Sequence, residues 1–184
     1  STPLTEEERE QLIPSYITLK RELNEAEQAN ILEAESWAFD RKRDVLNEKF
    51  LTVLHNRMFG RVWRWAGSYR RSQKNVGIDA YRIPIALRQL IEDCRYWIEH
   101  ETYSPDEIAS RFHHRLVAIH PFPNGNGRHA RLATDLLLRK LGQERFSWGK
   151  VNLVDASETR GTYINALRAA DKHDYGPLLA FVRS

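Results

Sequence analysis

The sequence has a single cysteine, Cys94, among 184 residues, and no C-x-x-C pair. An internal disulfide is therefore excluded, and so are the zinc and redox sites that are built from paired cysteines. A chain of this size has room for one compact domain whose core is held by packing alone. The cysteine usage also predicts a reducing, cytoplasmic compartment.

Long apolar runs and runs of one charge are also missing. No stretch approaches the roughly 18 apolar residues of a membrane span, and the start of the chain is acidic where a secretory signal would be basic and then apolar. The net charge is +3, with both signs interspersed along the chain. Because DNA-binding proteins usually gather Lys and Arg into blocks, neither a membrane nor a nucleic-acid partner is expected.

Helical periodicity covers most of the chain. Apolar residues recur at offsets of three, four and seven, the spacing that buries one face of a helix. The predicted helices span 22–42, 45–59, 84–98, 104–120, 127–142, 156–170 and 176–183. We therefore expect a mainly α-helical bundle, preceded by a lead-in segment that packs onto its body.

Local signals define some boundaries and one exception to the helical pattern. Ser104 is an N-cap residue followed by a first-turn proline and by Glu107, the arrangement that satisfies the free amides of a helix start. Gly142 stands where helices commonly end. Between residues 63 and 84, glycines and polar residues separate short alternating stretches. This segment predicts a short β-hairpin, or flap, with an exposed centre at residues 70–75.

The most informative segment is the loop H-P-F-P-N-G-N-G at residues 120–127, between two predicted helices. A glycine-rich turn that leads into a helix exposes unpaired backbone N–H groups at the positive end of the helix dipole, which favours an anion. Gly125 and Gly127 are expected to adopt positive φ and to let a ligand approach the backbone. The simpler alternative is a plain helix connection with solvated side chains around it.

Three side chains that suit phosphate chemistry flank this loop. Arg128 and Arg131 are three residues apart, so both are expected to project from one face of the helix and to grip phosphate oxygens. His120 ends the preceding helix, and an imidazole can take a proton from a hydroxyl group that attacks phosphorus. The pattern favours a polyphosphate ligand and a transfer reaction at phosphorus.

The run from His120 to Arg131 resembles the signature of the Fic (filamentation-induced-by-cAMP) family, H-x-F-x-[D/E]-G-N-G-R-x-x-R. Every fixed position matches except Asn124, which stands where the family usually has an acidic residue. The segment F-G-R-V-W-R-W-A-G before the flap and the closing stretch around Tyr163 are also similar to the family. The resemblance thus divides the chain into a catalytic core at 45–184 and an N-terminal segment and helix at 1–44.

The resemblance implies a Fic fold and a protein adenylyltransferase, which moves AMP from ATP to a hydroxyl side chain of a target protein. It assigns the general base to His120 and the loop anchor to Phe122. Arg128 would hold the inner phosphates and Arg131 the γ-phosphate. The target would dock on the flap near residues 70–83 by strand addition. The implied nucleotide-binding residues are Gly125, Asn126, Gly127, Arg128, Arg131 and Tyr163.

Asn124 bears on the metal that the resemblance implies. The family's acidic residue helps to hold Mg²⁺ against the phosphates, and hard cations favour anionic oxygen. Asn124 offers a neutral carbonyl oxygen, so we expect weaker Mg²⁺ affinity with the chemistry retained. Two alternatives stay open: a catalytically weak nucleotide-binding regulatory module, and a Fic-like enzyme that transfers a different phosphate-containing group.

Many Fic proteins carry an inhibitory helix with the pattern [S/T]-x-x-x-E-[G/N], whose glutamate pairs with the second arginine of the signature. Glu27 is the best match here, although its flanking positions depart from the pattern, and Glu22 is a second candidate. We expect Glu27 to reach Arg131 and Glu27→Gly to raise activity. The alternative is that both glutamates lie on a solvated helix face. Inhibition by an antitoxin-like partner chain and a homo-oligomeric state stay open as well.

Overall fold

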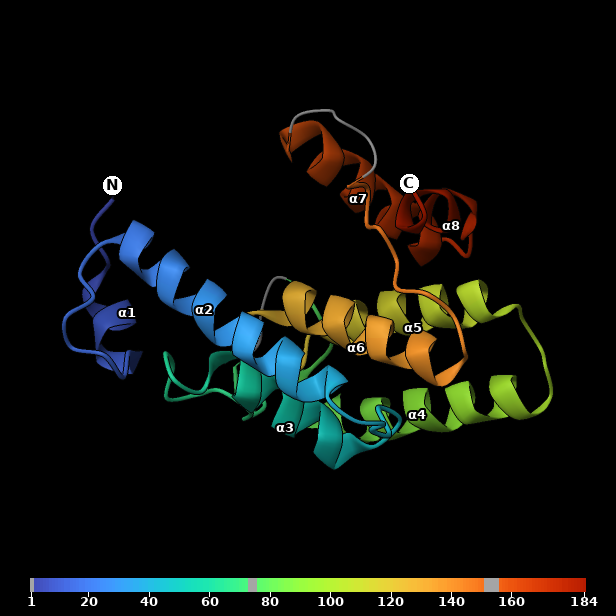
Figure 1. Cartoon of the computed structure of the whole chain (residues 1–184), viewed down its shortest axis with the longest axis horizontal. Coiled ribbons are helices and arrows are strands. Elements are labelled where there is room, and N and C mark those ends of the chain that lie inside the picture. Colours follow the sequence, from blue (N-terminus) through green and yellow to red (C-terminus); the bar gives the residue numbers. More distant parts are fainter. Residues whose placement is uncertain (1, 73–75, 151–155) are drawn as a thin grey trace.

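The computed structural model describes residues 2–72, 76–150 and 156–184. The mainly helical fold that the periodicity predicts is confirmed (Figure 1). In the described ranges, no helix combines the length and the apolar character that crossing a bilayer requires. The elements are α1 (Glu6–Gln11), α2 (Lys20–Phe39), α3 (Glu48–Phe59), the 3₁₀ turn η1 (Ala80–Arg82), α4 (Ile83–Glu99), α5 (Pro105–Ile119), α6 (Asn126–Lys140), α7 (Ala156–Asp171) and α8 (Gly176–Val182).

Helix α6 lies in the middle of the molecule and packs against α2, α3 and α5 (Figure 1). Its apolar face belongs to a large core that extends from α2 to α6 and includes Leu54, Met58, Phe112 and Leu137. Leu138, the next residue of α6, belongs to a second cluster with α7 and α8. Helix α6 therefore contributes side chains to both clusters, and its contact with the second one is near its C-terminal end.

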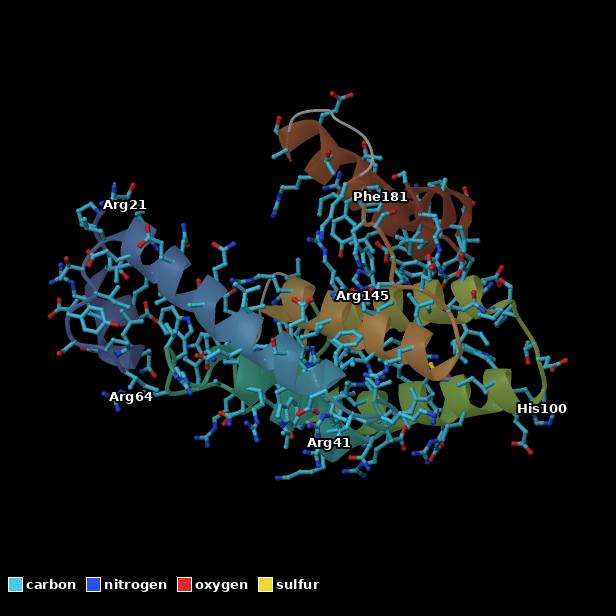
Figure 2. All side chains as sticks on the ribbon, viewed as in Figure 1. Arg21, Arg41, Arg64, His100, Arg145 and Phe181 are labelled. Carbon is cyan, nitrogen blue, oxygen red and sulfur yellow. The ribbon has the colours of Figure 1, made fainter. Side chains whose placement is uncertain are left out.

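The second cluster closes the C-terminal part of the fold. Phe181 of α8, which is labelled in Figure 2, packs against Tyr163 of α7, with their ring centroids 5.4 Å apart. Charged side chains such as Arg21, Arg41 and Arg64 project at the periphery of the molecule in the same view. The end of α5 and the start of α6 are joined by the loop at residues 120–125.

Helix boundaries follow the predicted capping signals. Ser104 Oγ accepts the N–H of Glu107 at 3.3 Å, as expected at the start of α5. Gly142 adopts a φ of +73° just after α6, which is the predicted terminating position. Helix α2 begins two residues earlier than predicted, since the Glu22 carboxylate accepts the N–H of Leu19 at 3.2 Å.

The N-terminal segment packs onto the body as predicted. Leu12 and Ile17 are buried in the large core. The N–H of Arg64 donates to the carbonyl of Gln11 at 3.0 Å, so the chain before α2 is attached to the turn after α3. Residues of 1–44 therefore share one core with the rest of the chain.

The described part of the predicted flap contains no β-strand. Residues 80–82 form a 3₁₀ turn and α4 begins at Ile83, so helical turns replace the second expected strand. Pro84 stands in the first turn of α4, where a fixed φ favours a helix start. The expected hairpin is not seen in these residues, and the turn predicted at 73–75 lies outside the described ranges.

Candidate active site

The loop between α5 and α6 is bracketed by two left-handed residues. His120 follows α5 with a φ of 53°, and Gly125 precedes α6 with a φ of 76°. A histidine at positive φ is strained, so its surroundings must hold it there. A Cβ at Gly125 would lie 2.5 Å from the Phe59 ring, so close packing and positive φ both require glycine. The expectation for Gly127 was wrong: it is an ordinary helical residue of α6.

Gly125→Ala is expected to destabilise the fold by about 1–3 kcal/mol, because the added methyl group clashes with Phe59 and the residue is strained at positive φ. The measurement is the free energy of unfolding from urea titration. Gly127→Ala is the matched control: a Cβ there meets no described heavy atom within 4 Å. The control should be neutral or slightly stabilising, and equal losses in both variants would contradict the argument.

Asn126 closes the loop on itself through Phe122. Its Oδ1 accepts the Phe122 N–H at 2.9 Å, and its Nδ2 donates to the Phe122 carbonyl at 2.9 Å. The Phe122 ring is fully buried and stacks on His55, with centroids 3.7 Å apart. Phe122 is thus placed as the expected anchor. The Asn126 side chain therefore shapes the loop, and its backbone N–H stands at the start of α6.

His55 of α3 is a second support of the loop that the sequence did not indicate. Its Nδ1 accepts the N–H of Gly67 at 2.9 Å, so its Nε2 carries the proton and donates to the carbonyl of Asn124 at 2.9 Å. Burial is the largest cause that lowers the pKa of His55 to about 3, so the ring is neutral at pH 7. A neutral histidine thereby joins α3, the turn at Gly67 and the loop.

Three buried histidines predict that the protein loses stability in acid. Burial lowers the pKa of His55 and of His113 to about 3 and that of His129 to about 4. The unfolded chain titrates near pH 6.5, so it binds more protons than the folded state below that value. The three neutral histidines therefore contribute their full stabilisation above about pH 6.5. As the pH drops below this value, the free energy of unfolding falls by up to about 1.4 kcal/mol per pH unit for each histidine.

We expect the urea midpoint to fall steeply from about pH 6.5 to about pH 4.5. His55→Asn should be less stable at pH 7 and should show a shallower slope, because one histidine no longer takes up a proton on unfolding. His100→Asn, at an exposed position, controls for the substitution itself and should be as stable as wild type at pH 7. An unchanged slope in His55→Asn would contradict the assignment of a neutral buried ring.

Arg128 and Arg131 contact different walls of the site. The Arg128 guanidinium lies 4.8 Å from the centre of the Phe59 ring and 3.4 Å from the Glu27 carboxylate. The Arg131 guanidinium lies 4.7 Å from the centre of the Tyr163 ring, on the side of α7. The contacts of the two guanidinium groups with described residues have no partner in common.

Glu27 contacts Arg128, so the expectation that it reaches Arg131 was wrong. It is buried in α2, and its Oε2 also accepts the indole N–H of Trp63 at 3.1 Å. Glu22, the second candidate, caps the start of its own helix. Of the two glutamates, only Glu27 therefore meets a signature arginine, and its position is fixed by the neutral donor of Trp63 as well as by the cation.

Tyr163, one of the implied nucleotide-binding residues, lies beside Arg131. Its hydroxyl is hydrogen-bonded to His113 Nε2 at 2.7 Å. Burial is the largest cause that raises the pKa of the Tyr163 hydroxyl, so it stays protonated. A cavity of about 470 Å³ opens beside these residues, and its polar lining includes Arg131, Lys150 and Arg160. Three cations beside aromatic rings suit an anionic ligand that has an aromatic part.

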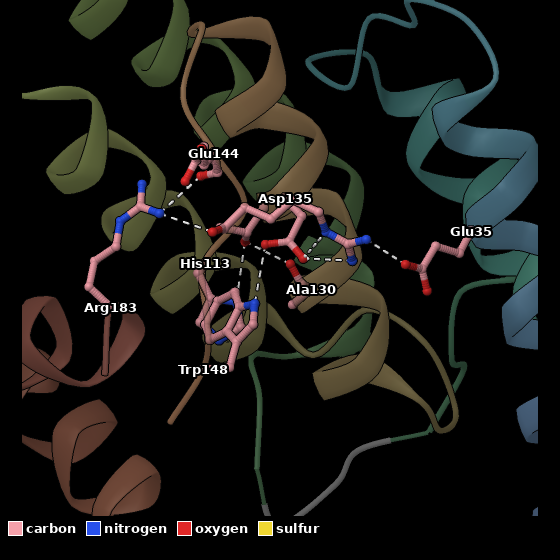
Figure 3. A network of polar contacts seen from close by, with 9 residues as sticks. Glu35, His113, Ala130, Asp135, Glu144, Trp148 and Arg183 are labelled. Atoms are coloured by element: carbon pink, nitrogen blue, oxygen red, sulfur yellow. Dashed lines mark hydrogen bonds and ion pairs between the residues drawn. The ribbon is translucent and has the colours of Figure 1, made fainter. Parts of the chain in front are cut away.

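A polar network holds the rings of this wall in place (Figure 3). Asp135 of α6 accepts the Trp148 indole N–H on Oδ1 at 3.2 Å, and its Oδ2 accepts from both Nε and Nη2 of Arg145. Arg145 also forms an ion pair with Glu35 of α2. Trp148 in turn packs on His113, with ring centroids 4.6 Å apart. The network thus links α2 to the side of α6 where Arg131 lies.

Arg70 departs most from its expected environment. The sequence placed it in an exposed flap centre, but only 3% of its surface is accessible. Its Nε donates to the carbonyl of His120, and its backbone N–H donates to the carbonyl of Pro121 at 2.9 Å. Arg70 therefore belongs to the site.

Asn124 is the predicted metal ligand. Its Oδ1 accepts the Gly125 N–H at 2.7 Å, which uses one of its lone pairs. The described part of the chain has no group of three or more His, Cys, Asp or Glu side chains that could hold a metal ion. A resident ion bound by protein side chains does not fit these residues. An ion that arrives on nucleotide phosphates and takes one neutral oxygen from Asn124 does fit.

Comparison with known sequences gives a consistent result. The sequence model of the Fic/DOC family matches residues 45–138. Protein adenylyltransferase Fic from Aedes aegypti is 30% identical over 145 residues, which cover 77% of this chain and 28% of that protein. The protein of the same name from Drosophila melanogaster is 31% identical over 138 residues, which cover 73% of this chain and 27% of that protein. This chain thus spans little more than a quarter of the length of these curated relatives.

Solved structures share the fold. The BepC protein, a VirB-translocated effector from Bartonella tribocorum solved with bound AMPPNP, has a TM-score of 0.69 at 18% identity, and the match covers 97% of both chains. A fragment of Fic-1 from C. elegans has a TM-score of 0.67 at 24% identity and covers 85% of this chain and 48% of that one. At these identities the similarity concerns the fold.

Proposed function

This chain belongs to the Fic/DOC family, and from that premise we propose that it is a protein adenylyltransferase that transfers AMP from ATP to a hydroxyl side chain of a target protein. The observation that carries the proposal is the α5–α6 loop. A histidine held at positive φ stands before a glycine-capped helix whose first two turns carry two arginines. The name of the relatives that are about 30% identical supports the same activity.

In the proposed reaction, His120 takes the proton of the target hydroxyl group as its oxygen attacks the α-phosphorus of ATP. A new P–O bond forms, the bond from the α-phosphorus to the oxygen bridging to the β-phosphate breaks, and pyrophosphate leaves. The free N–H groups at the start of α6 and the Arg128 guanidinium stabilise charge on the inner phosphates. Arg131 takes the γ-phosphate. We assign Mg²⁺ to the co-substrate, bound chiefly by its phosphates.

The target docks, in this proposal, beside residues 76–83. Val76 and Tyr81 are 60% and 78% exposed, and such large apolar side chains favour contact with a partner. Gly77 lies between them in the chain, and a Cβ there would be 2.7 Å from the His120 Cβ. An extended target segment on this surface would bring its hydroxyl group close to the proposed base. Pairing by strand addition is part of the same proposal.

We assign to Glu27 the role of an inhibitory residue. Arg128 must turn to the inner phosphates for the proposed reaction, and in this structure its guanidinium lies 3.4 Å from the Glu27 carboxylate. A buried carboxylate that already occupies the cation competes with the phosphates for it. Helix α2 then has two functions: it completes the core and it lowers the affinity of the site for ATP.

A second candidate function is a regulator that binds nucleotide and transfers nothing. The neutral Asn124 at the acidic position favours it, because a weaker hold on Mg²⁺ reduces stabilisation of the leaving pyrophosphate. Both candidates predict nucleotide binding at the start of α6, so binding alone does not distinguish them.

Transfer of label distinguishes the candidates. The protein is incubated with cell lysate and ATP labelled at the α- or the γ-phosphorus, and modified peptides are identified by mass spectrometry. The adenylyltransferase predicts α-label on a Ser, Thr or Tyr hydroxyl, with no γ-label. Transfer of γ-label indicates a different phosphate-containing group. Tight ATP binding without transfer of either label indicates the regulator.

A further inference from the structure

Arg70 is buried, and the acceptors of its guanidinium among the described residues are backbone carbonyls. Nη2 donates to the Ile119 carbonyl at 3.1 Å and Nη1 to the Ser72 carbonyl at 3.1 Å. Further bonds run from Nε to the His120 carbonyl and from Nη2 to the Ile78 carbonyl. One side chain thus ties together the end of α5, the strained histidine and both sides of the segment before η1.

Backbone carbonyls surround the charge of Arg70 in the part of the chain that the structure describes. None of the ion pairs of the described residues includes Arg70. Burial is the largest cause that lowers its pKa, with Asp79 opposing it. Two of its acceptors, the carbonyls of Ile119 and His120, lie at the C-terminal end of α5, where the helix dipole favours a cation. The planar fork of arginine can serve several carbonyls at once, which an ammonium group cannot match.

Gly77 allows this arrangement to close around His120. A Cβ at Gly77 would lie 2.7 Å from the Arg70 Nη2 and 2.7 Å from the His120 Cβ. Its φ of +95° also lies in the region that favours glycine. The N–H of Ile78 points to the Ile119 carbonyl at 3.5 Å. The two stretches that flank residues 73–75 are therefore both attached to the backbone from which the His120 side chain projects.

We infer that Arg70 is the positioning residue of His120: it holds the histidine backbone at positive φ and fixes the target-docking segment at a constant distance from the base. The inference rests on the proposed function for its catalytic consequence. Arg70 donates to backbone carbonyls and makes no proton transfer. Its effect is to keep the imidazole in reach of the target hydroxyl group, where a misplacement of about 1 Å costs on the order of 100-fold in rate.

Arg70→Lys tests this inference, with Arg139→Lys as a matched control. Arg139, near the C-terminal end of α6, also donates to backbone carbonyls at a helix end: those of Phe39, the last residue of α2, and of Arg41. Arg70→Lys is expected to bind ATP within about twofold of wild type and to transfer label about 10- to 100-fold more slowly, in kcat more than in KM for ATP. The control should transfer at the wild-type rate.

A second measurement does not depend on transfer. In ¹⁵N-histidine-labelled protein, the His120 ring signals, assigned with His120→Asn, should shift or broaden in Arg70→Lys and stay in place in Arg139→Lys. Hydrogen exchange over residues 116–127 should accelerate only in Arg70→Lys. If the wild-type protein transfers no label, the proposed function fails. The ring signals and the hydrogen exchange then still decide whether Arg70 positions His120. Unchanged ring signals and exchange in Arg70→Lys, or an equal rate loss in both variants, would overturn the inference.

Discussion

His120→Asn is expected to abolish most label transfer while ATP binding is retained. Removal of a general base typically costs about 10²- to 10⁴-fold in rate, and the phosphates are assigned to the start of α6 and to Arg128 and Arg131. Asparagine is the informative replacement, because it tolerates the left-handed conformation that His120 adopts at φ 53° better than most residues. The variant therefore removes the titrating ring with little change in the loop.

The measurement pairs the initial rate of transfer with the Kd for ATP from calorimetry. His100→Asn is the control: His100 lies at the far end of α4, at the edge of the molecule in Figure 2, and should transfer at the wild-type rate. A His120→Asn variant that transfers at the wild-type rate would rule out the histidine as base. Loss of ATP binding would instead assign it to the nucleotide site.

The helical parts of this fold could be predicted because their signals are local. The cap at Ser104 directly precedes the apolar stripe of α5 in the chain. The glycine that marks the end of α6 likewise follows that helix directly. The candidate loop could be found for the same reason: its glycines, histidine and arginines are contiguous. Its anchor Phe122 is where the resemblance implies it, buried beneath the loop.

The supports of the loop could not be predicted because they come from distant parts of the chain. Arg70 donates to a residue 50 positions away, and His55 to one 69 positions away. The local sequence pattern predicted an exposed turn around Arg70, and it did not indicate any role for His55. The partner of Glu27 was missed for a related reason. Spacing shows that Arg128 and Arg131 share a helix face, but only the packing of α2 on α6 decides which of them a glutamate meets.

Glu27→Gln is expected to raise the transfer rate and the ATP affinity by about tenfold or more. The carboxylate competes with phosphate for Arg128, and a hydrogen bond to a charged group is worth about 1.5–3 kcal/mol. Glutamine keeps an oxygen for the indole N–H of Trp63 and loses the charge that attracts Arg128. Glu27→Gly removes both contacts and adds a glycine inside a helix, so its effect on activity would be mixed with a loss of stability.

The contrast between the two variants separates inhibition from packing. An inhibitory Glu27 predicts that Glu27→Gln transfers faster than wild type with a melting temperature close to it. A purely structural Glu27 predicts no gain in rate and a lower melting temperature in Glu27→Gly. Glu22→Gln is the control, because Glu22 caps the start of α2 and should leave ATP affinity unchanged. Equal ATP affinity in Glu27→Gln and wild type would show that Arg128 is already available to phosphate in the resting protein.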